Sequence, residues 1–137
     1  MSELRIGACV EKLEEVQNFI KEMITPFVRE EKIAYEIEIV VEEIFVNIAH
    51  YAYAPQKGEA VIRCEIRKES EVYVQIAFED QGKAFNPLEK EDADITLSAE
   101  ERKIGGLGIL MVKRMMDNVE YEYKNGRNIL TVKKKLR

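Results

Sequence analysis

The stretch that decides the fold reads Glu42-Glu43-Ile44-Phe45-Val46-Asn47-Ile48-Ala49-His50. Apolar residues recur at helical spacing through this stretch and ahead of it, at Ile33, Ile37, Val41, Ile44 and Ile48. This period predicts an amphipathic helix, from about residue 33 to about residue 52, that buries one face in a core.

A group of polar side chains lies beside that apolar stripe. At about 100° per residue, Glu36, Glu43, Asn47 and His50 fall together, roughly a quarter turn away. Glu43 and Asn47 are four residues apart, so their side chains meet. A carboxylate next to a carboxamide at the edge of a core indicates either chemistry or the solvated flank of an ordinary helix. Taken alone, this stretch favours the solvated flank.

Composition bounds the class of protein. The chain has 137 residues, of which 46% are hydrophobic and 34% are charged, as expected for one globular domain over residues 1–137. The net charge of -5 argues against a nucleic-acid binder. Cys9 and Cys64 have no metal or redox spacing, which indicates free thiols of a reducing cytoplasm. We expect no signal peptide, because no apolar run follows Glu3 and Arg5. We expect no membrane span either, because the longest uncharged run, Ile44–Gln56, is too short.

The remaining periodicities predict an α+β fold. A short strand is expected at Glu3–Cys9, followed by a helix at Val10–Val28 that Pro26 kinks or ends. Alternating residues predict two hairpins. They are expected at Ile62–Ile66 with Val72–Phe78, and at Val119–Lys124 with Arg127–Leu136 around Asn125-Gly126. With a helix from Ile104 to about Asp117, this order favours a two-layer sandwich with helices on one face of a mixed or antiparallel sheet.

Two further motifs carry potential chemistry. Asp80 has the parity of the apolar residues of its strand, so it should face the core, where a carboxylate is costly unless it is satisfied. With Gly82 after it, Asp80 could accept a hydrogen bond from a ligand's amino group, or it could cap a turn. Gly105-Gly106-Leu107-Gly108, at a helix start, is either a phosphate cradle or a tight turn.

The three motifs together are more specific than any one of them alone. In this order, Glu43-x-x-x-Asn47, Asp80-x-Gly82 and Gly105-Gly106-x-Gly108 resemble the N, G1 and G2 boxes of the GHKL ATPase superfamily, which has the Bergerat, or histidine-kinase-like ATPase, fold. The stretches Glu42–Tyr53, Gly105–Val112 and Met116–Tyr121 are similar to the bacterial anti-sigma factor serine/threonine kinases. The single His fits poorly with a histidine kinase, whose phospho-acceptor helices are not found here.

The resemblance implies a role for each boxed residue. Glu43 would be the general base and Asn47 would coordinate Mg²⁺, which prefers oxygen ligands. Asp80 would receive the adenine amino group of ATP, and Gly82 would allow close approach. The other implied contacts with ATP are Arg102 and Lys103 at the γ-phosphate, Gly105, Gly106, Leu107 and Gly108 at the phosphates, and Thr131 near adenine. The acidic connection, about residues 81–103, would be an ATP lid.

Some positions depart from the family pattern. Tyr51 stands where the family often has His or Lys, with His50 beside it, and Ala84 replaces a second glycine after Asp80. The orientation of Thr131 depends on the turn at Asn125-Gly126. A two-residue turn pairs Leu130 with Tyr121 and sends Thr131 to the other face, and a three-residue turn reverses this.

The sequence therefore predicts an anti-sigma-type regulator that binds ATP·Mg²⁺. It would phosphorylate a serine or threonine of an anti-anti-sigma antagonist and sequester a sigma factor or a similar client. The alternative is a non-catalytic, ATP-dependent switch that binds its partner without phosphoryl transfer. Glu43 favours the kinase, because only the kinase needs a base. The resemblance also implies a cytoplasmic homodimer with no direct contact to nucleic acid or membrane.

Overall fold

The computed structural model describes residues 1–53, 56–89 and 106–137. In chain order the elements are β1 (Ser2–Gly7), η1 (Val10–Lys12), α1 (Leu13–Ile24), α2 (Glu31–Asn47), η2 (Ile48–Ala52), β2 (Glu59–Lys68), β3 (Val72–Asp80), η3 (Pro87–Glu89), α3 (Gly106–Met115), β4 (Asn118–Lys124) and β5 (Arg127–Lys135). The strands form a five-stranded sheet in the order β1-β2-β3-β5-β4. Every neighbouring pair is antiparallel.

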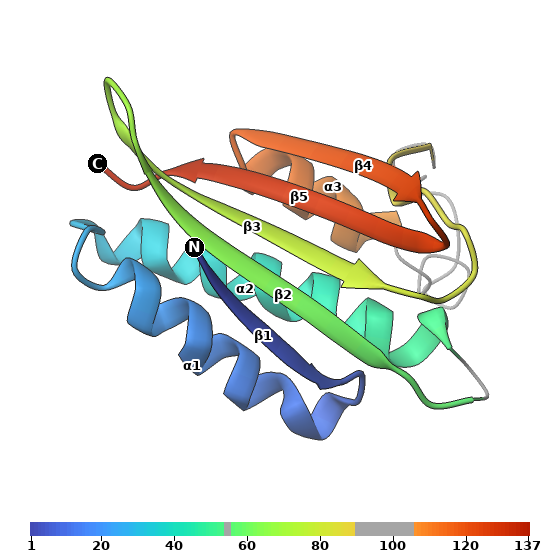
Figure 1. Cartoon of the computed structure of the whole chain (residues 1–137). Coiled ribbons are helices and arrows are strands. Elements are labelled where there is room, and N and C mark those ends of the chain that lie inside the picture. Colours follow the sequence, from blue (N-terminus) through green and yellow to red (C-terminus); the bar gives the residue numbers. More distant parts are fainter. Residues whose placement is uncertain (54–55, 90–105) are drawn as a thin grey trace.

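The helices α1, α2 and α3 lie on one face of this sheet (Figure 1). The predicted α+β sandwich is therefore confirmed, and the sheet is antiparallel rather than mixed. In the described part of the chain, no helix combines the length and the apolar character needed to cross a membrane.

The core forms where the apolar stripes of the helices meet alternate residues of the strands. The helices contribute Val16, Ile20, Ile24, Ile37, Val40, Val41, Ile44, Phe45, Ile109 and Val112. The sheet contributes Ile62, Cys64, Val74, Ile76, Phe78, Leu130 and Val132. Burial raises the pKa of the Cys64 thiol to about 12, so this cysteine acts as a small apolar side chain.

Two helix predictions need correction in detail. Val10–Lys12 is a separate 3-10 turn, and α1 ends at Ile24, so Pro26 follows the end of the helix and does not kink it. The predicted helix over residues 33–52 is α-helical only to Asn47 and continues as the π-helical turn η2. Wide turns of this kind are frequent at functional sites.

The register of the second hairpin, between β4 and β5, decides on which face of the sheet Thr131 lies. Lys124 pairs with Arg127, and Tyr121 pairs with Leu130, so Asn125 and Gly126 form a two-residue turn. Thr131 then pairs with Ala77 and Glu120. Successive side chains point to opposite faces, so Thr131 lies on the face that the helices leave open, while Leu130 faces the core.

A core-facing lysine fixes the far end of α3. The ammonium of Lys134, on β5, donates a hydrogen bond to the carbonyl of Met115 at the last residue of α3. It also lies 3.6 Å from Glu36 Oε1 on α2. A cation at a helix C-terminus complements the helix dipole. Glu36 therefore ties α2 to α3 and β5, although it shares a helix face with Glu43.

Burial along α2 leads to a stability prediction. Ile37 is 1% exposed, whereas Tyr35 on the same helix is 63% exposed. We expect Ile37→Ala to lower the free energy of unfolding by about 2–5 kcal/mol, because it removes buried methyl groups and leaves a cavity. The control Tyr35→Ala should change it by less than about 0.5 kcal/mol. Urea denaturation followed by circular dichroism measures both, and equal losses would contradict the assigned core face.

Candidate functional site

A cavity of about 300 Å³ lies between the end of α2, the start of α3 and strands β3, β5 and β4. Its apolar lining includes Ile44, Ile48, Phe78, Ile109, Val112 and Leu130. Its polar lining includes Glu43, Asn47, Asp80, Lys83, Tyr121 and Asn128. An apolar cavity with a few convergent polar groups is the usual form of a small-molecule site.

The helix α2 brings Glu43 and Asn47 together at the cavity wall. The Nδ2 atom of Asn47 donates a hydrogen bond to Glu43 Oε1 over 3.3 Å. An ionised carboxylate only accepts hydrogen bonds, so this contact sets the orientation of the amide. The Oδ1 atom of Asn47 therefore remains as an oxygen ligand. The predicted meeting of these two side chains is confirmed.

The first turn of α3 packs directly on Glu43. A Cβ atom added to Gly108 would overlap Glu43 Oε1, so any larger residue at this position displaces the carboxylate. The third glycine of the motif thus has a steric role that the sequence did not indicate. It lets the start of α3 approach α2 at the position of Glu43.

Asp80 ends β3 and faces the cavity, as its parity predicts. The residue is 7% exposed. Its Oδ1 atom accepts hydrogen bonds from Gly82 N at 2.9 Å and from Asn128 Nδ2 at 3.0 Å. Burial raises the pKa of Asp80, while these two hydrogen bonds act in the opposite direction. Among the described residues, no donor bonds to Oδ2, so this acceptor is left for a ligand.

Asn128 is a site residue that the sequence prediction missed. It lies directly opposite Asp80 on β5 and is 7% exposed. Asn128 precedes Leu130 and Val132 at a spacing of two, so it has the parity of the core-facing residues. The argument applied to Asp80, that a polar residue with core parity needs a partner, would have identified it.

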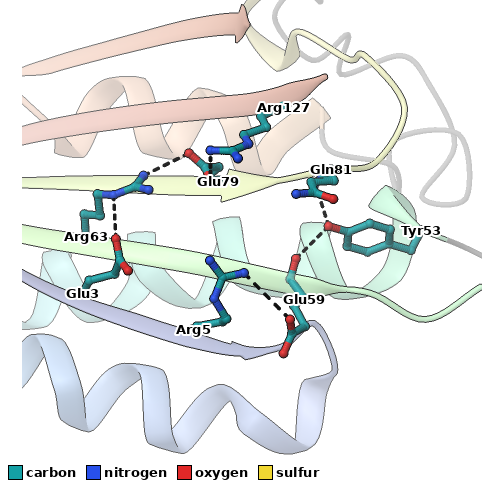
Figure 2. Close-up of polar contacts among 8 residues, drawn as sticks. All are labelled: Glu3, Arg5, Tyr53, Glu59, Arg63, Glu79, Gln81 and Arg127. Carbon is teal, nitrogen blue, oxygen red and sulfur yellow. Dashed lines mark hydrogen bonds and ion pairs between the residues drawn. The ribbon is translucent and has the colours of Figure 1, made fainter. Parts of the chain in front are cut away.

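The wide turn after α2 holds the segment that follows Asp80. The hydroxyl of Tyr53 donates to the carbonyl of Glu59 at 2.7 Å and accepts from Gln81 N at 2.6 Å (Figure 2). The carbonyl of Ala52 accepts a hydrogen bond from Lys83 N at 3.4 Å. A Cβ at Gly82 would overlap that carbonyl, so the close approach requires glycine.

A network of ion pairs links the ends of β3 and β5 on the sheet face that the helices do not cover. Glu79, 6% exposed, lies 3.0 Å from Arg63 Nη1 and 3.4 Å from Arg127 Nη1 (Figure 2). Arg63 also lies 2.9 Å from Glu3 on β1. Glu79 and Arg127 immediately precede Asp80 and Asn128, so β3 and β5 are linked by polar side chains on both faces.

The structure does not bring all the predicted site residues together. Glu43, Asn47 and Asp80 line the cavity, Gly82 and Gly108 contact the elements beside it, and Gly106 and Leu107 open α3. Arg102, Lys103, Gly105 and most of the expected lid lie outside the described residues. Thr131 lies on the open face of the sheet, away from the cavity. Tyr51 lines the cavity, and His50 packs edge-on against the Tyr51 ring with the ring centroids 5.8 Å apart.

The family model of the histidine kinase-like ATPase domain matches residues 6–134. The chain is 24% identical over 101 residues to the serine/threonine-protein kinase BtrW of Bordetella bronchiseptica, covering 74% of this chain and 70% of that protein. It is 25% identical over 103 residues to the serine-protein kinase RsbW of Listeria monocytogenes, covering 72% of this chain and 64% of that protein.

A solved structure shares the fold. The crystal structure of the RsbU and RsbW domains of a Mycobacterium tuberculosis protein matches with a TM-score of 0.67 and 14% identity. The match covers 99% of this chain and 33% of the mycobacterial chain.

The burial of Asp80 leads to a prediction about pH and stability. A carboxyl group whose pKa is raised by folding binds its proton more tightly in the folded state. The wild type should therefore lose stability as the pH rises from the ordinary carboxyl pKa of about 3.9 to the higher folded value. Asp80→Asn keeps both Oδ1 acceptor bonds and removes this loss. At pH 7 we expect its melting temperature to equal or exceed that of the wild type.

Calorimetric melting curves from pH 3 to pH 8 measure this difference. Glu122→Gln on the exposed edge of β4 is the control, and its melting temperature should track the wild type throughout. A melting temperature of Asp80→Asn clearly below the wild type at pH 7 would contradict the account of Asp80.

Proposed function

The chain belongs to the histidine kinase-like ATPase domain family, and from this premise we propose that it is an ATP-dependent protein serine/threonine kinase of the anti-sigma type. It binds ATP with Mg²⁺ in the cavity between α2, α3 and β3. It transfers the γ-phosphoryl group to a serine or threonine of an anti-anti-sigma antagonist, and it sequesters a sigma factor or a similar client as a cytoplasmic homodimer.

The observation that carries nucleotide binding is the buried acceptor of Asp80. Asp80 is 7% exposed and lines a mostly apolar cavity, where a hydrogen bond from a ligand to its Oδ2 atom is worth more than in water. The amino group of adenine is a donor that satisfies a carboxylate oxygen. Ile44, Ile48, Phe78 and Leu130 offer apolar surface to the planar base. The phosphates would then extend toward Asn47 and the start of α3.

The donor set at α2 fits Mg²⁺. The amide orientation set by Glu43 leaves Asn47 Oδ1 as a hard oxygen ligand. Mg²⁺ is usually held by one or two protein oxygens, with substrate phosphates and waters completing six ligands. When bound, Mg²⁺ supplies positive charge to the phosphates. Arg102, Lys103 and Gly105 stay proposed phosphate contacts from the family resemblance.

Glu43 is proposed as the general base. It accepts the proton of the attacking serine or threonine hydroxyl through a carboxylate oxygen. The hydroxyl oxygen forms a bond to the γ-phosphorus while the bond from that phosphorus to the bridging oxygen breaks, and ADP leaves. Two contacts orient the carboxylate: Asn47 donates to Oε1, and the α3 backbone at Gly108 packs against it. These contacts leave Oε2 as the proton acceptor.

The two similar kinases support the class of the acceptor. Both are named as kinases acting on serine or on serine/threonine of proteins. The sigma factor, the antagonist and the homodimer are implied by the resemblance to anti-sigma factor kinases, which rests on the stretches Glu42–Tyr53, Gly105–Val112 and Met116–Tyr121. Purification from the native host, with identification of the co-purifying proteins, would name these partners.

Nucleotide binding is tested by titration calorimetry with ATP and Mg²⁺. Asp80→Asn presents an amide donor where the adenine amino group needs an acceptor. We expect its affinity for ATP to fall by about 10–100-fold, the size of a lost hydrogen bond to a charged group. Glu122→Gln should bind as the wild type does. Wild-type affinity in a folded Asp80→Asn protein would contradict the adenine assignment.

Catalysis is tested by transfer of radiolabelled phosphate to the co-purifying antagonist. Glu43→Gln keeps the size of the side chain and removes the base, so transfer should fall by about 10²–10⁴-fold while ATP and partner binding persist. Glu42→Gln, at the exposed neighbouring position, is the matched control and should retain full transfer. Undiminished transfer by Glu43→Gln would refute the base assignment. ATP binding by the wild type without transfer to any partner would favour the non-catalytic switch.

A further inference from the structure

The buried side chain of Asn128 makes hydrogen bonds through both ends of its amide at the cavity. Its Nδ2 atom donates to Asp80 Oδ1 at 3.0 Å and to the carbonyl of Lys83 at 2.8 Å. Its Oδ1 atom accepts from Phe85 N at 3.0 Å and from the hydroxyl of Tyr121. Both ends of the amide are therefore engaged, and exchanging them would set donors against donors and acceptors against acceptors.

The fixed amide determines what Asp80 can offer to a ligand. Asn128 and Gly82 N both bond to Oδ1, which holds the plane of the carboxylate and leaves Oδ2 toward the cavity. An ionised carboxylate at this position only accepts hydrogen bonds, so it satisfies an amino group and opposes a carbonyl oxygen. A protonated carboxyl can also donate, and it would tolerate a carbonyl.

The donor from Asn128 favours the ionised form. Burial raises the pKa of Asp80, and the hydrogen bond from Asn128 is the largest influence that lowers it. Glu79 also raises the pKa through its charge, although its side chain lies on the opposite face with Arg63 and Arg127. Without this donor, the protonated form of Asp80 is less disfavoured relative to the ionised form. The orientation of the carboxylate plane is also less restricted.

We propose that Asn128 is a positioning residue that gives the cavity its preference for a 6-amino over a 6-oxo purine nucleotide, through its hydrogen bond to Asp80 Oδ1. This role rests on the proposed nucleotide site. Asn128 acts on the ligand only through Asp80. Its bonds to Lys83 and Phe85 hold the segment after β3 in place and are a second, structural function of the same amide.

The test separates these two functions with a matched pair of variants, Asn128→Thr and Asn128→Val. The two side chains have the same shape and are both suited to a strand, and both lose the amide bonds to Lys83 and Phe85. Only threonine has a hydroxyl that can donate to Asp80. Calorimetry with ATP and with inosine triphosphate, which has a 6-oxo group, gives the ratio of the two dissociation constants.

We expect the wild type to prefer ATP and Asn128→Thr to keep most of that preference. In Asn128→Val the preference should fall by about 10-fold or more, the size of a lost hydrogen bond to a charged group. Asn118→Val, on the exposed edge strand β4, is the control and should leave the ratio unchanged. If Asn128 is only structural, both variants weaken the two nucleotides equally and keep the wild-type ratio, which overturns the proposal.

The outcomes also separate this inference from the proposed function. A wild type that binds neither nucleotide contradicts the proposed function itself. A wild type that binds ATP, with a valine variant that still discriminates, contradicts only the role of Asn128. Should Asn128→Val fail to fold, Tyr121→Phe removes one of the two donors that hold the amide oxygen and should lower the ratio by about 2–10-fold. An unchanged ratio in a folded Tyr121→Phe protein would also overturn the proposal.

Discussion

The hydrogen bond between Asp80 and Asn128 is the interaction on which the arrangement of the site depends. A carboxylate on the covered face of a sheet is unfavourable unless donors reach it. Here one donor comes from the partner strand, and the other comes from the backbone of the following turn. The turn after Asp80 requires Gly82, because the backbone of Gly82 packs against the carbonyl of Ala52. The end of α2 and the end of β3 are thereby held at a fixed separation, with the cavity between them.

The same arrangement includes groups that lower the stability of the folded protein. Burial disfavours the charged form of Asp80, and one of its oxygens has no donor among the described residues. Gly108 leaves no side chain between α3 and the Glu43 carboxylate. Binding sites commonly lower the stability of a fold, because they hold polar groups where a ligand will meet them. The apolar core, which continues from the cavity lining through the rest of the helix–sheet interface, offsets this loss of stability.

Much of this could be predicted from the sequence because the deciding signals are local. The apolar stripe through Ile37 and Ile44 fixes which face of α2 is buried, and Asn125-Gly126 fixes a hairpin. The parity of Asp80 with Val74, Ile76 and Phe78 placed its carboxylate toward the core. The spacing of Glu43 and Asn47 was enough to predict that they meet. Each of these inferences spans fewer than ten residues.

What the sequence did not reveal depends on contacts between distant segments. Asn128 reaches Asp80 across 48 positions, and only the register of β5 against β3 brings them together. The same register turned Thr131 to the open face, because one residue in the length of the turn decides which side chains point inward. The change from α-helix to π-helix after Asn47 has no recognisable local signal, since the segment keeps its apolar spacing through Ile48.

The paired polar contacts on both faces of β3 and β5 also protect the chain against misalignment. Asp80 meets Asn128 on one face, and Glu79 meets Arg127 on the other, at neighbouring positions of the same two strands. If β5 slipped by one residue, Arg127 would turn inward, Asn128 would turn to solvent, and Leu130 and Val132 would lose their burial. This one-residue slip is therefore penalised by charge as well as by hydrophobicity. The geometry of the site and the fidelity of strand pairing are therefore properties of the same four side chains.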